Sequence, residues 1–197
     1  MALFKNKYRT ESHRLKNWDY SSQSIYFITL VTQNRKCLFG SIKNNQMVLN
    51  DNGKIIENEL LKSIEIRERW FFHNWVIMPN HIHLLVEILE LSTKNNVETH
   101  NVETHNVETH CSASLQQQLS PKNILSRKPN SISSFVGIFK SVTTKQINSL
   151  LNADNSDSIW QSNYHDHIVR NYNTFDKIYY YIKNNPKNWD SDSINPH

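Results

Sequence analysis

The sequence predicts an α+β fold: a ferredoxin-like antiparallel sheet with helices packed on one side. Two observations predict it. Segments rich in β-branched and aromatic residues alternate with segments whose apolar residues recur at helical spacing, in the order strand, helix, two strands, helix, strand, helix. The two consecutive strands flank a tight turn, which makes them antiparallel neighbours. This order is typical of an antiparallel sheet covered by helices, with a C-terminal helix at the end.

The first strand and the first helix are predicted from composition and spacing. Ser24 to Gln33 has the β-branched and aromatic content of a central strand. Asn50 or Asp51 then caps a helix, because either side chain can accept a hydrogen bond from an amide at a helix start. Apolar residues follow at four-residue spacing, namely Ile56, Leu60 and Ile64. We expect this helix to cover one face of the sheet.

A hairpin carries the first candidate metal ligands. Phe71 to Met78 and His81 to Ile88 are its two strands, and Pro79-Asn80 forms the turn. Side chains alternate along a strand, so His81 and His83 lie side by side on one face, where two imidazoles can bind one ion. Two histidines on a solvent-facing strand surface usually have no chemical role, so the pair gains weight only from the rest of the chain.

Three elements follow the hairpin. Ile132 to Leu151 has most of its apolar residues on one helical face, which predicts a core helix with a basic outer surface. Ser158 to Val169 is predicted to be the last strand. Thr174 to Asn185 is predicted to be a short amphipathic helix, with a start signal at Asn173 and a stop at Pro186.

Helical geometry selects Tyr181 as the candidate nucleophile. The apolar stripe of the last helix consists of Phe175, Ile178, Tyr179 and Ile182. Tyr181 lies off this stripe, on a shoulder shared with Lys177 and Asn185, four residues before and after it. Tyr179 points into the stripe and Tyr180 to the opposite flank. A hydroxyl, an ammonium and an amide oxygen would therefore project together.

A second His-x-His pair, His165 and His167, competes with the first as a metal site. Its middle residue, Asp166, is charged, so a strand there would bury either the carboxylate or both histidines. In the first pair the middle residue is apolar and anchors the strand to the core. We therefore expect the second pair to have a structural or DNA-positioning role.

Composition indicates one domain with appendages. The 197 residues, 38% of them hydrophobic, suffice for one core. We expect residues 1–20 to form a basic N-terminal arm, 21–190 the domain and 191–197 a C-terminal tail. Within the domain, residues 91–130 are rich in polar residues and contain three consecutive copies of Asn-Val-Glu-Thr-His, which predicts a disordered insertion.

The sequence also bears on compartment and partners. No apolar run approaches the ~20 residues of a membrane helix and the N-terminus lacks a signal-peptide stretch, so we expect a cytoplasmic protein with no membrane partner. Cys37 and Cys111 are the only cysteines and are far apart, so neither a disulfide nor a cysteine metal site is expected. The net charge of +4 is mild, so affinity for phosphates must come from local patches.

Four segments in order resemble a known family. They are Trp75-Val-Ile-Met-Pro-Asn-His-Ile-His-Leu-Leu-Val86, Phe139-Lys140 with Thr143-Thr144-Lys145, Trp160 to Asn171, and Tyr181-Ile-Lys-Asn-Asn-Pro186. Together they resemble the REP-associated tyrosine transposases, relatives of the IS200-like Y1 transposases in the histidine-hydrophobic-histidine (HUH) endonuclease class. The resemblance covers roughly residues 20 to 189, apart from the insertion, and implies the same fold.

The resemblance implies a single-stranded DNA endonuclease and transposase that acts at hairpin-containing sequences. Tyr181 would attack a phosphodiester, form a 5′-phosphotyrosine link and release a 3′-hydroxyl, so that strands can be rejoined. His81, His83 and the amide oxygen of Asn185 would hold Mg²⁺ or Mn²⁺, which would polarise the scissile phosphate.

The DNA partner would be bound by cationic side chains on phosphates and by aromatic side chains on bases. The candidate cations are Lys140, Lys145, Arg170, Lys177, Arg35 and Lys36. REP-associated members tend to be monomers, and the segment Trp160 to Asn171 resembles theirs, so a monomer is favoured over a homodimer.

Two alternatives remain open. The first is a catalytically inactive DNA-hairpin binding protein; the joint presence of His81, His83, Tyr181 and Asn185 argues against it, since a binder needs none of them in this geometry. The second is a metal-dependent phosphodiesterase in which water is the nucleophile and Tyr181 only packs. Such an enzyme would form no covalent adduct and would survive Tyr181→Phe.

Overall fold

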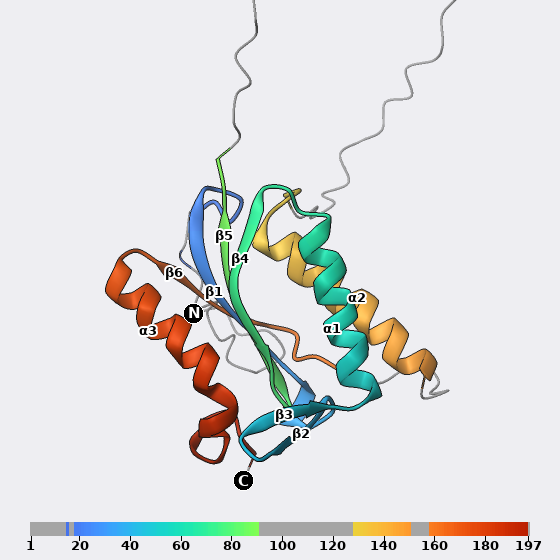
Figure 1. Ribbon diagram of the computed structural model, residues 1–197. Helices are drawn as coiled ribbons and strands as arrows, with labels where there is room; N and C mark the ends of the chain where they lie inside the picture. Colours follow the sequence, from blue (N-terminus) through green and yellow to red (C-terminus); the bar gives the residue numbers. More distant parts are fainter. Residues whose placement is uncertain (1–14, 16–17, 91–127, 151–157, 197) are drawn as a thin grey trace, which may run out of the picture.

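The chain folds around a four-stranded antiparallel sheet (Figure 1). The computed structural model describes residues 15, 18–90, 128–150 and 158–196; the repeats and nearly all of the basic arm lie outside them. The strands run in the order β4-β5-β1-β6, and every neighbouring pair is antiparallel. Their bounds are β1 Ser24–Val31, β4 Trp70–Ile77, β5 His81–Ile88 and β6 His165–Val169. The predicted α+β fold is confirmed.

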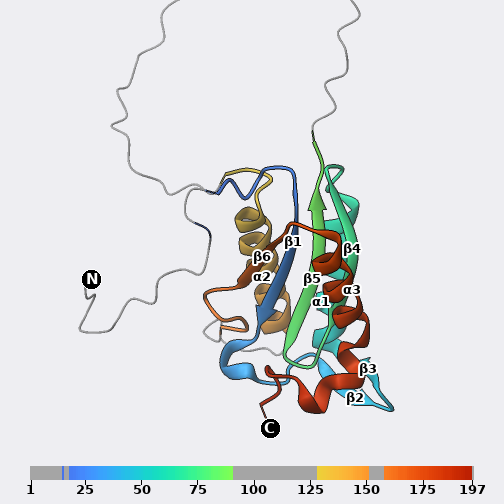
Figure 2. The ribbon, with the colours of Figure 1, turned by 90° about the vertical axis from the view of Figure 1, so that its left-hand side faces the viewer.

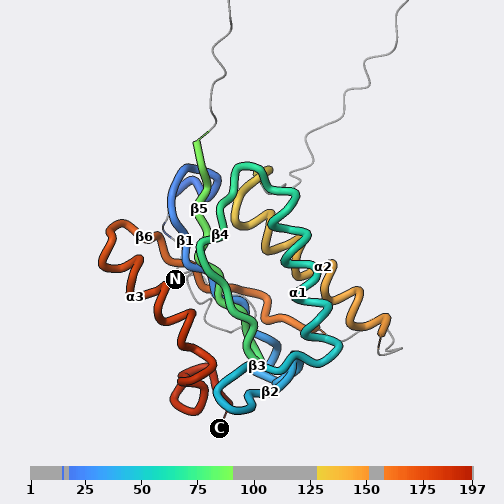
Figure 3. The backbone as a smooth tube through the Cα atoms, viewed as in Figure 1, coloured from blue at the N-terminus to red at the C-terminus, as the bar shows by residue number. Residues whose placement is uncertain are grey.

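Helices cover both faces of this sheet (Figures 1 and 3). Helices α1 (Asp51–Glu65) and α2 (Ile132–Leu150) pack on one face, as the ferredoxin-like arrangement requires. Helix α3 (Tyr172–Asn184) packs on the opposite face, away from the side expected for the helices. The physical reason is that the second face also carries apolar side chains, including Leu85 of β5, and the stripe of α3 buries them.

The side chains of β5 alternate between the two faces of the sheet, and this alternation fixes the position of the two histidines. Ile82, Leu84 and Val86 point into the core beneath α1 and α2, so the odd-numbered residues of the strand face α3. His81 pairs with Val31 and His83 with Thr29 across the central β1–β5 ladder. A one-residue slip would bury both imidazoles in the apolar core, so this register is strongly specified.

A second, two-stranded sheet was not predicted. It consists of β2 (Gly40–Lys43) and β3 (Gln46–Leu49), joined at Asn44 and Asn45 with φ of 50° and 61°. Asparagine tolerates this left-handed region, which the tight hairpin turn requires. The strands are short and only half-buried, so they lack the apolar density that identifies β1 and β5.

Two element starts differ from the sequence prediction. The last strand is only five residues long, because residues 158–164 meet the chain of β1 only through an isolated bridge between Trp160 and Thr32. In this segment the Lys140 ammonium donates to the carbonyl oxygens of Gln161 (2.7 Å) and Asn163 (2.9 Å). Helix α3 begins earlier than expected. Its cap is Asn171, whose side-chain oxygen accepts from the Thr174 amide at 2.8 Å. For α1, the cap is Asn50 rather than Asp51.

Ordered structure continues past the predicted helix stop at Pro186. It continues as a short 3-10 helix, η2 (Asn185–Ser191), which turns at the end of α3 and contacts β3 (Figure 2). Proline occupies the first turn of η2, where its missing amide proton is not needed. Within the described residues, every helix is too short or too polar to span a bilayer.

Candidate active site

Two buried imidazoles lie side by side at the start of β5. The exposed fractions of His81 and His83 are 0% and 2%, and their ring centroids are 4.5 Å apart. Helix α3 and the segment after it cover them, with the Trp189 ring of η2 centred 6.0 Å from that of His81. The pair therefore lies in a protected site, and not on the solvent-facing strand surface where histidines commonly have no role.

Helix α3 brings the Tyr181 hydroxyl to His83. The distance from His83 Nε2 to this hydroxyl is 3.1 Å, and His83 Nδ1 lies 2.8 Å from the Thr29 hydroxyl on β1. The next residue, Ile182, is fully buried between α3 and the sheet and sets the rotation of the helix. Asn74 of β4 donates to the Tyr179 carbonyl oxygen at 3.0 Å, which fixes the helix along its axis. Tyr181 therefore faces the histidines.

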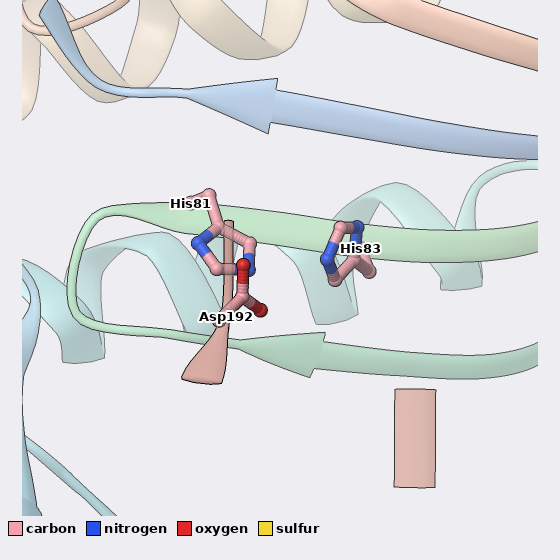
Figure 4. A group of neighbouring side chains, drawn as sticks. All are labelled: His81, His83 and Asp192. Carbon is pink, nitrogen blue, oxygen red and sulfur yellow. The ribbon is translucent and has the colours of Figure 1, made fainter. Parts of the chain in front are cut away.

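A carboxylate completes the cluster. Asp192 approaches His81 and His83 from the segment after η2 (Figure 4). One ligand atom from each of the three residues lies within 4.8 Å of the others. Asn185 donates from Nδ2 to Asp192 Oδ2 at 2.7 Å, and the Tyr181 hydroxyl donates to the same oxygen at 3.5 Å. Two distant parts of the chain thus form one polar site.

Two buried ligand atoms in this cluster have no hydrogen-bond partner within the described residues. They are His81 Nε2 and Asn185 Oδ1. A buried polar atom without a partner destabilises a fold by about 1–3 kcal/mol, so such atoms are rare unless they serve a function. A divalent ion would satisfy both. Imidazole nitrogens with carboxylate and amide oxygens suit Mn²⁺ and related ions by affinity, and the oxygens also suit Mg²⁺. The residues therefore fit a divalent metal.

Burial sets the protonation of the three ring groups. It lowers the pKa of His81 to about 4, although the Asp192 charge and Asn185 act in the opposite direction. Burial, followed by the neighbouring His81, lowers the pKa of His83 well below its usual range. Both imidazoles are neutral at pH 7, the form that binds metal. Burial, followed by the Asp192 charge, raises the pKa of Tyr181 to about 12, so this phenol is protonated at neutral pH.

The structure brings some of the predicted site residues together and leaves others apart. His81, His83, Tyr181 and Asn185 meet, but Lys177 is exposed one turn earlier on α3 and makes no hydrogen bond or ion pair to them. His165 and His167 of the second pair are both exposed, and the only group of potential metal ligands found among the described residues is the one with Asp192.

The six candidate DNA contacts do not form one surface. Lys140 and Lys145 lie on α2, across the sheet from α3 and its Lys177. The Lys140 ammonium already bonds two backbone carbonyls. Arg170 and Lys36 are exposed, and the exposed Arg35 donates from Nη1 to the Ser193 carbonyl oxygen at 2.9 Å, beside the segment that carries Asp192.

Three residues of the site were not predicted: Asp192, Asn80 and Thr29. Asp192 was assigned to the C-terminal tail of residues 191–197, outside the predicted domain, and Pro186 was interpreted as the stop of the last helix. Asn80 was interpreted only as a turn residue, yet it is fully buried and its Oδ1 lies 2.8 Å from His81 Nδ1. Proline within the first turn of a helix was the one available signal that the chain continues to fold.

Comparison with solved structures first identifies the fold. The solved structure of a REP-associated tyrosine transposase bound to a REP hairpin matches this chain with a TM-score of 0.50 at 15% identity, over 90% of this chain and 74% of that one. At this identity the likeness shows the fold, so the chain has a transposase-like α+β fold. No protein-family model matches the chain.

The family is shown by sequence. An uncharacterized protein of Haemophilus influenzae is 35% identical over 189 residues, which is 93% of this chain and 91% of that protein. The chain belongs to the same family as this Haemophilus influenzae protein.

Proposed function

We propose that this protein is a single-stranded DNA transposase that cleaves and rejoins DNA at hairpin-containing sequences through attack by Tyr181. One observation carries the proposal: the Tyr181 hydroxyl lies 3.1 Å from a buried histidine, inside a cluster of two imidazoles and a carboxylate that fits a divalent ion. A tyrosine that only packs needs no such neighbours. The fold shared with a tyrosine transposase supports the same class of activity.

The reaction is a transesterification. The Tyr181 oxygen forms a bond to phosphorus while the bond from phosphorus to the 3′ oxygen of the preceding nucleotide breaks. The phenol gives up its proton, the departing 3′ oxygen gains one, and the products are a 5′-phosphotyrosine and a 3′-hydroxyl. One phosphodiester is exchanged for another, so a 3′-hydroxyl can attack the phosphotyrosine and rejoin the strand without an energy source.

The protein's own groups prepare Tyr181 for this step. Its raised pKa means that deprotonation needs assistance, and the Asp192 carboxylate oxygen, 3.5 Å from the hydroxyl, is an acceptor for the proton. His83 fixes the direction of the hydroxyl. Mg²⁺ or Mn²⁺, when bound, would polarise the scissile phosphate and stabilise its developing charge. His81, His83 and Asp192 would hold the ion, with Asn185 Oδ1 as a further ligand.

The DNA would approach from the exposed side of Tyr181, which is 40% exposed. Arg35 and Lys36 lie near the segment that carries Asp192. Arg170 lies just before the start of α3, and Lys177 lies within this helix. We propose these four residues as phosphate contacts. Lys145 and Lys140 on α2 would contact a more distant part of a folded strand. Because all ligands and the nucleophile come from one chain, we propose that a monomer is active.

The experiment is incubation of the protein with end-labelled single-stranded hairpin DNA and Mn²⁺ or Mg²⁺, followed by a denaturing gel. Wild type is expected to form a labelled covalent adduct, and Tyr181→Phe and His81→Ala to form none. Tyr180→Phe is the matched control, since Tyr180 is on the same helix but 57% exposed. This control is expected to form the adduct as wild type does.

Two results would replace the proposal. Cleavage by Tyr181→Phe without an adduct would show a metal-dependent phosphodiesterase that uses water. Tight hairpin binding by wild type with no cleavage across a panel of hairpins and both ions would show a catalytically inactive binding protein.

A further inference from the structure

We propose that Asn80 is a positioning residue that fixes the tautomer of His81. It holds the ring proton on Nδ1 and leaves the Nε2 lone pair directed at the candidate metal site. The consequence for metal binding rests on the proposed function, but the assignment of the proton rests on hydrogen bonds alone.

The side-chain amide of Asn80 has only one possible orientation. Asn80 lies fully buried in the β4–β5 turn, and its Nδ2 donates to the carbonyl oxygens of Arg35 (3.0 Å) and Ile194 (2.9 Å). Backbone carbonyl oxygens only accept hydrogen bonds. Rotating the amide by 180° would place its oxygen against both of them, so the network decides which atom is nitrogen.

The remaining atom, Asn80 Oδ1, decides the proton on His81. It lies 2.8 Å from His81 Nδ1, and an amide oxygen can only accept, so Nδ1 must carry the proton. A neutral imidazole carries one proton. His81 Nε2 is therefore unprotonated, and an unprotonated nitrogen is the one that can bind a metal ion.

The surroundings of Nε2 would favour the other tautomer if Asn80 did not hold the proton on Nδ1. Nε2 is buried, has no hydrogen-bond partner within the described residues, and belongs to the cluster with the Asp192 carboxylate. A proton on Nε2 would face this carboxylate and gain an acceptor, so without Asn80 the other tautomer would be favoured. Asn80 therefore keeps His81 Nε2 unprotonated and able to bind a metal ion, although a proton there could donate to the Asp192 carboxylate.

The same side chain links the tautomer to the segment that supplies Asp192. Arg35 precedes β2, and Ile194 lies two residues after Asp192. Arg35 also bonds the Ser193 carbonyl oxygen through its guanidinium, so two residues fasten the C-terminal segment and only one of them contacts His81. Comparing variants of Asn80 and Arg35 therefore distinguishes anchoring of the segment from control of the His81 tautomer.

The first test uses the metal-free wild-type protein at pH 7. Long-range ¹H–¹⁵N correlation spectra of the histidine side chains report which ring nitrogen carries the proton, and the His81→Gln variant assigns the His81 signals. We expect His81 to be protonated on Nδ1. Protonation on Nε2 would overturn the inference, and this outcome needs no variant of Asn80 to fold.

The second test compares Asn80→Ala with Arg35→Ala by calorimetric titration with Mn²⁺. Asn80→Ala is expected to move the His81 proton to Nε2 and to weaken Mn²⁺ binding about 10- to 100-fold, the usual range for partners of metal-binding histidines. Arg35→Ala should leave the His81 proton on Nδ1 and weaken Mn²⁺ binding less than Asn80→Ala does, because it removes only a bond that fastens the segment. Equal loss of affinity in both variants, with His81 still protonated on Nδ1, would mean that Asn80 only anchors the segment.

Failure of this inference and failure of the proposed function give different results. An Nδ1 tautomer with tight Mn²⁺ binding but no DNA adduct would overturn the function and leave the role of Asn80 intact. An active protein whose His81 carries its proton on Nε2 would overturn only the role of Asn80.

Discussion

Two buried imidazoles and a half-buried phenol lie together at the start of β5, and burial decides their protonation. His81 and His83 are held neutral and Tyr181 is held protonated at pH 7. The histidine pair and the tyrosine were predicted from strand alternation and the helical wheel, because both are local properties of sequence. Asp192 was not, because its contact with β5 depends on the path of the chain after α3, which no local pattern encodes.

Stability should fall on acidification because His81 is neutral when folded. Its pKa falls from 6.5 to about 4 on folding, so between these values the unfolded chain binds the proton and the folded chain does not. Unfolding is therefore favoured as pH decreases through this window. We expect a His81 contribution on the order of 2 kcal/mol to the loss between pH 7 and pH 5.

Urea denaturation at the two pH values measures this loss in wild type and in His81→Gln. The variant should lose less stability than wild type. An identical loss in both proteins would show that His81 is not held neutral by the fold.

The carboxylate of Asp192 should be needed for metal binding. Asp192→Asn keeps the shape of the side chain but removes the charge, and Mn²⁺ affinity should fall by no less than the ~10- to 100-fold typical of second-layer partners. Asp190→Asn is the matched control, an exposed carboxylate two residues away. By calorimetric titration, the control should bind Mn²⁺ with an affinity within about twofold of that of wild type. Equal Mn²⁺ affinity in the two variants would show that Asp192 is not a metal ligand.

Helix α3 is the element on which the site depends, since it carries Tyr181 on one side and buries Ile182 on the other. Its existence was predicted from an apolar stripe, and α1 and α2 were predicted in the same way. Strand β1 was predicted from its β-branched and aromatic residues, and the β4–β5 hairpin from the turn at Pro79-Asn80. The face on which α3 packs was not predicted, because both faces of the sheet are apolar. The β2–β3 hairpin was missed because its strands are only four residues long and half-buried, and η2 was missed because most of its residues are exposed.

Removing the buried contact of α3 should loosen the helix. Ile182→Ala deletes a fully buried side chain between α3 and the sheet, and such changes destabilise by about 2–5 kcal/mol. Ile138→Ala on α2 is the control, since Ile138 is 55% exposed and should change stability by about 0.5 kcal/mol or less. Urea denaturation measures both, and similar small losses would contradict the packing of α3 described above.

The molecule as a whole builds its site from parts of the chain that are about a hundred residues apart in sequence. The sheet supplies the histidines, and the last thirty residues supply Tyr181, Asn185 and Asp192. The hydrogen bonds of Ile194 and Ser193 to Asn80 and Arg35 make the expected tail part of the fold, so we place the end of the domain beyond Ile194. In the proposed active site, the metal ligands and Tyr181 then all come from one chain.

The repeats should be dispensable for this site. Deletion of residues 96–110 shortens the connection between β5 and α2, and the entropy of closing a loop changes only slowly with its length. We expect the deletion variant to unfold at a urea concentration close to that of wild type and to form the same DNA adduct. Loss of the adduct by a folded variant would assign the repeats a role in DNA binding or catalysis.

The most direct test of the tyrosine chemistry is to locate the DNA on the protein. Trypsin should release residues 178–183 as one peptide, because Lys177 and Lys183 flank the three consecutive tyrosines. After reaction with hairpin DNA and nuclease trimming, fragmentation of this peptide by mass spectrometry should place the nucleotide on Tyr181. A nucleotide on Tyr179 or Tyr180, or on any other peptide, would contradict the account.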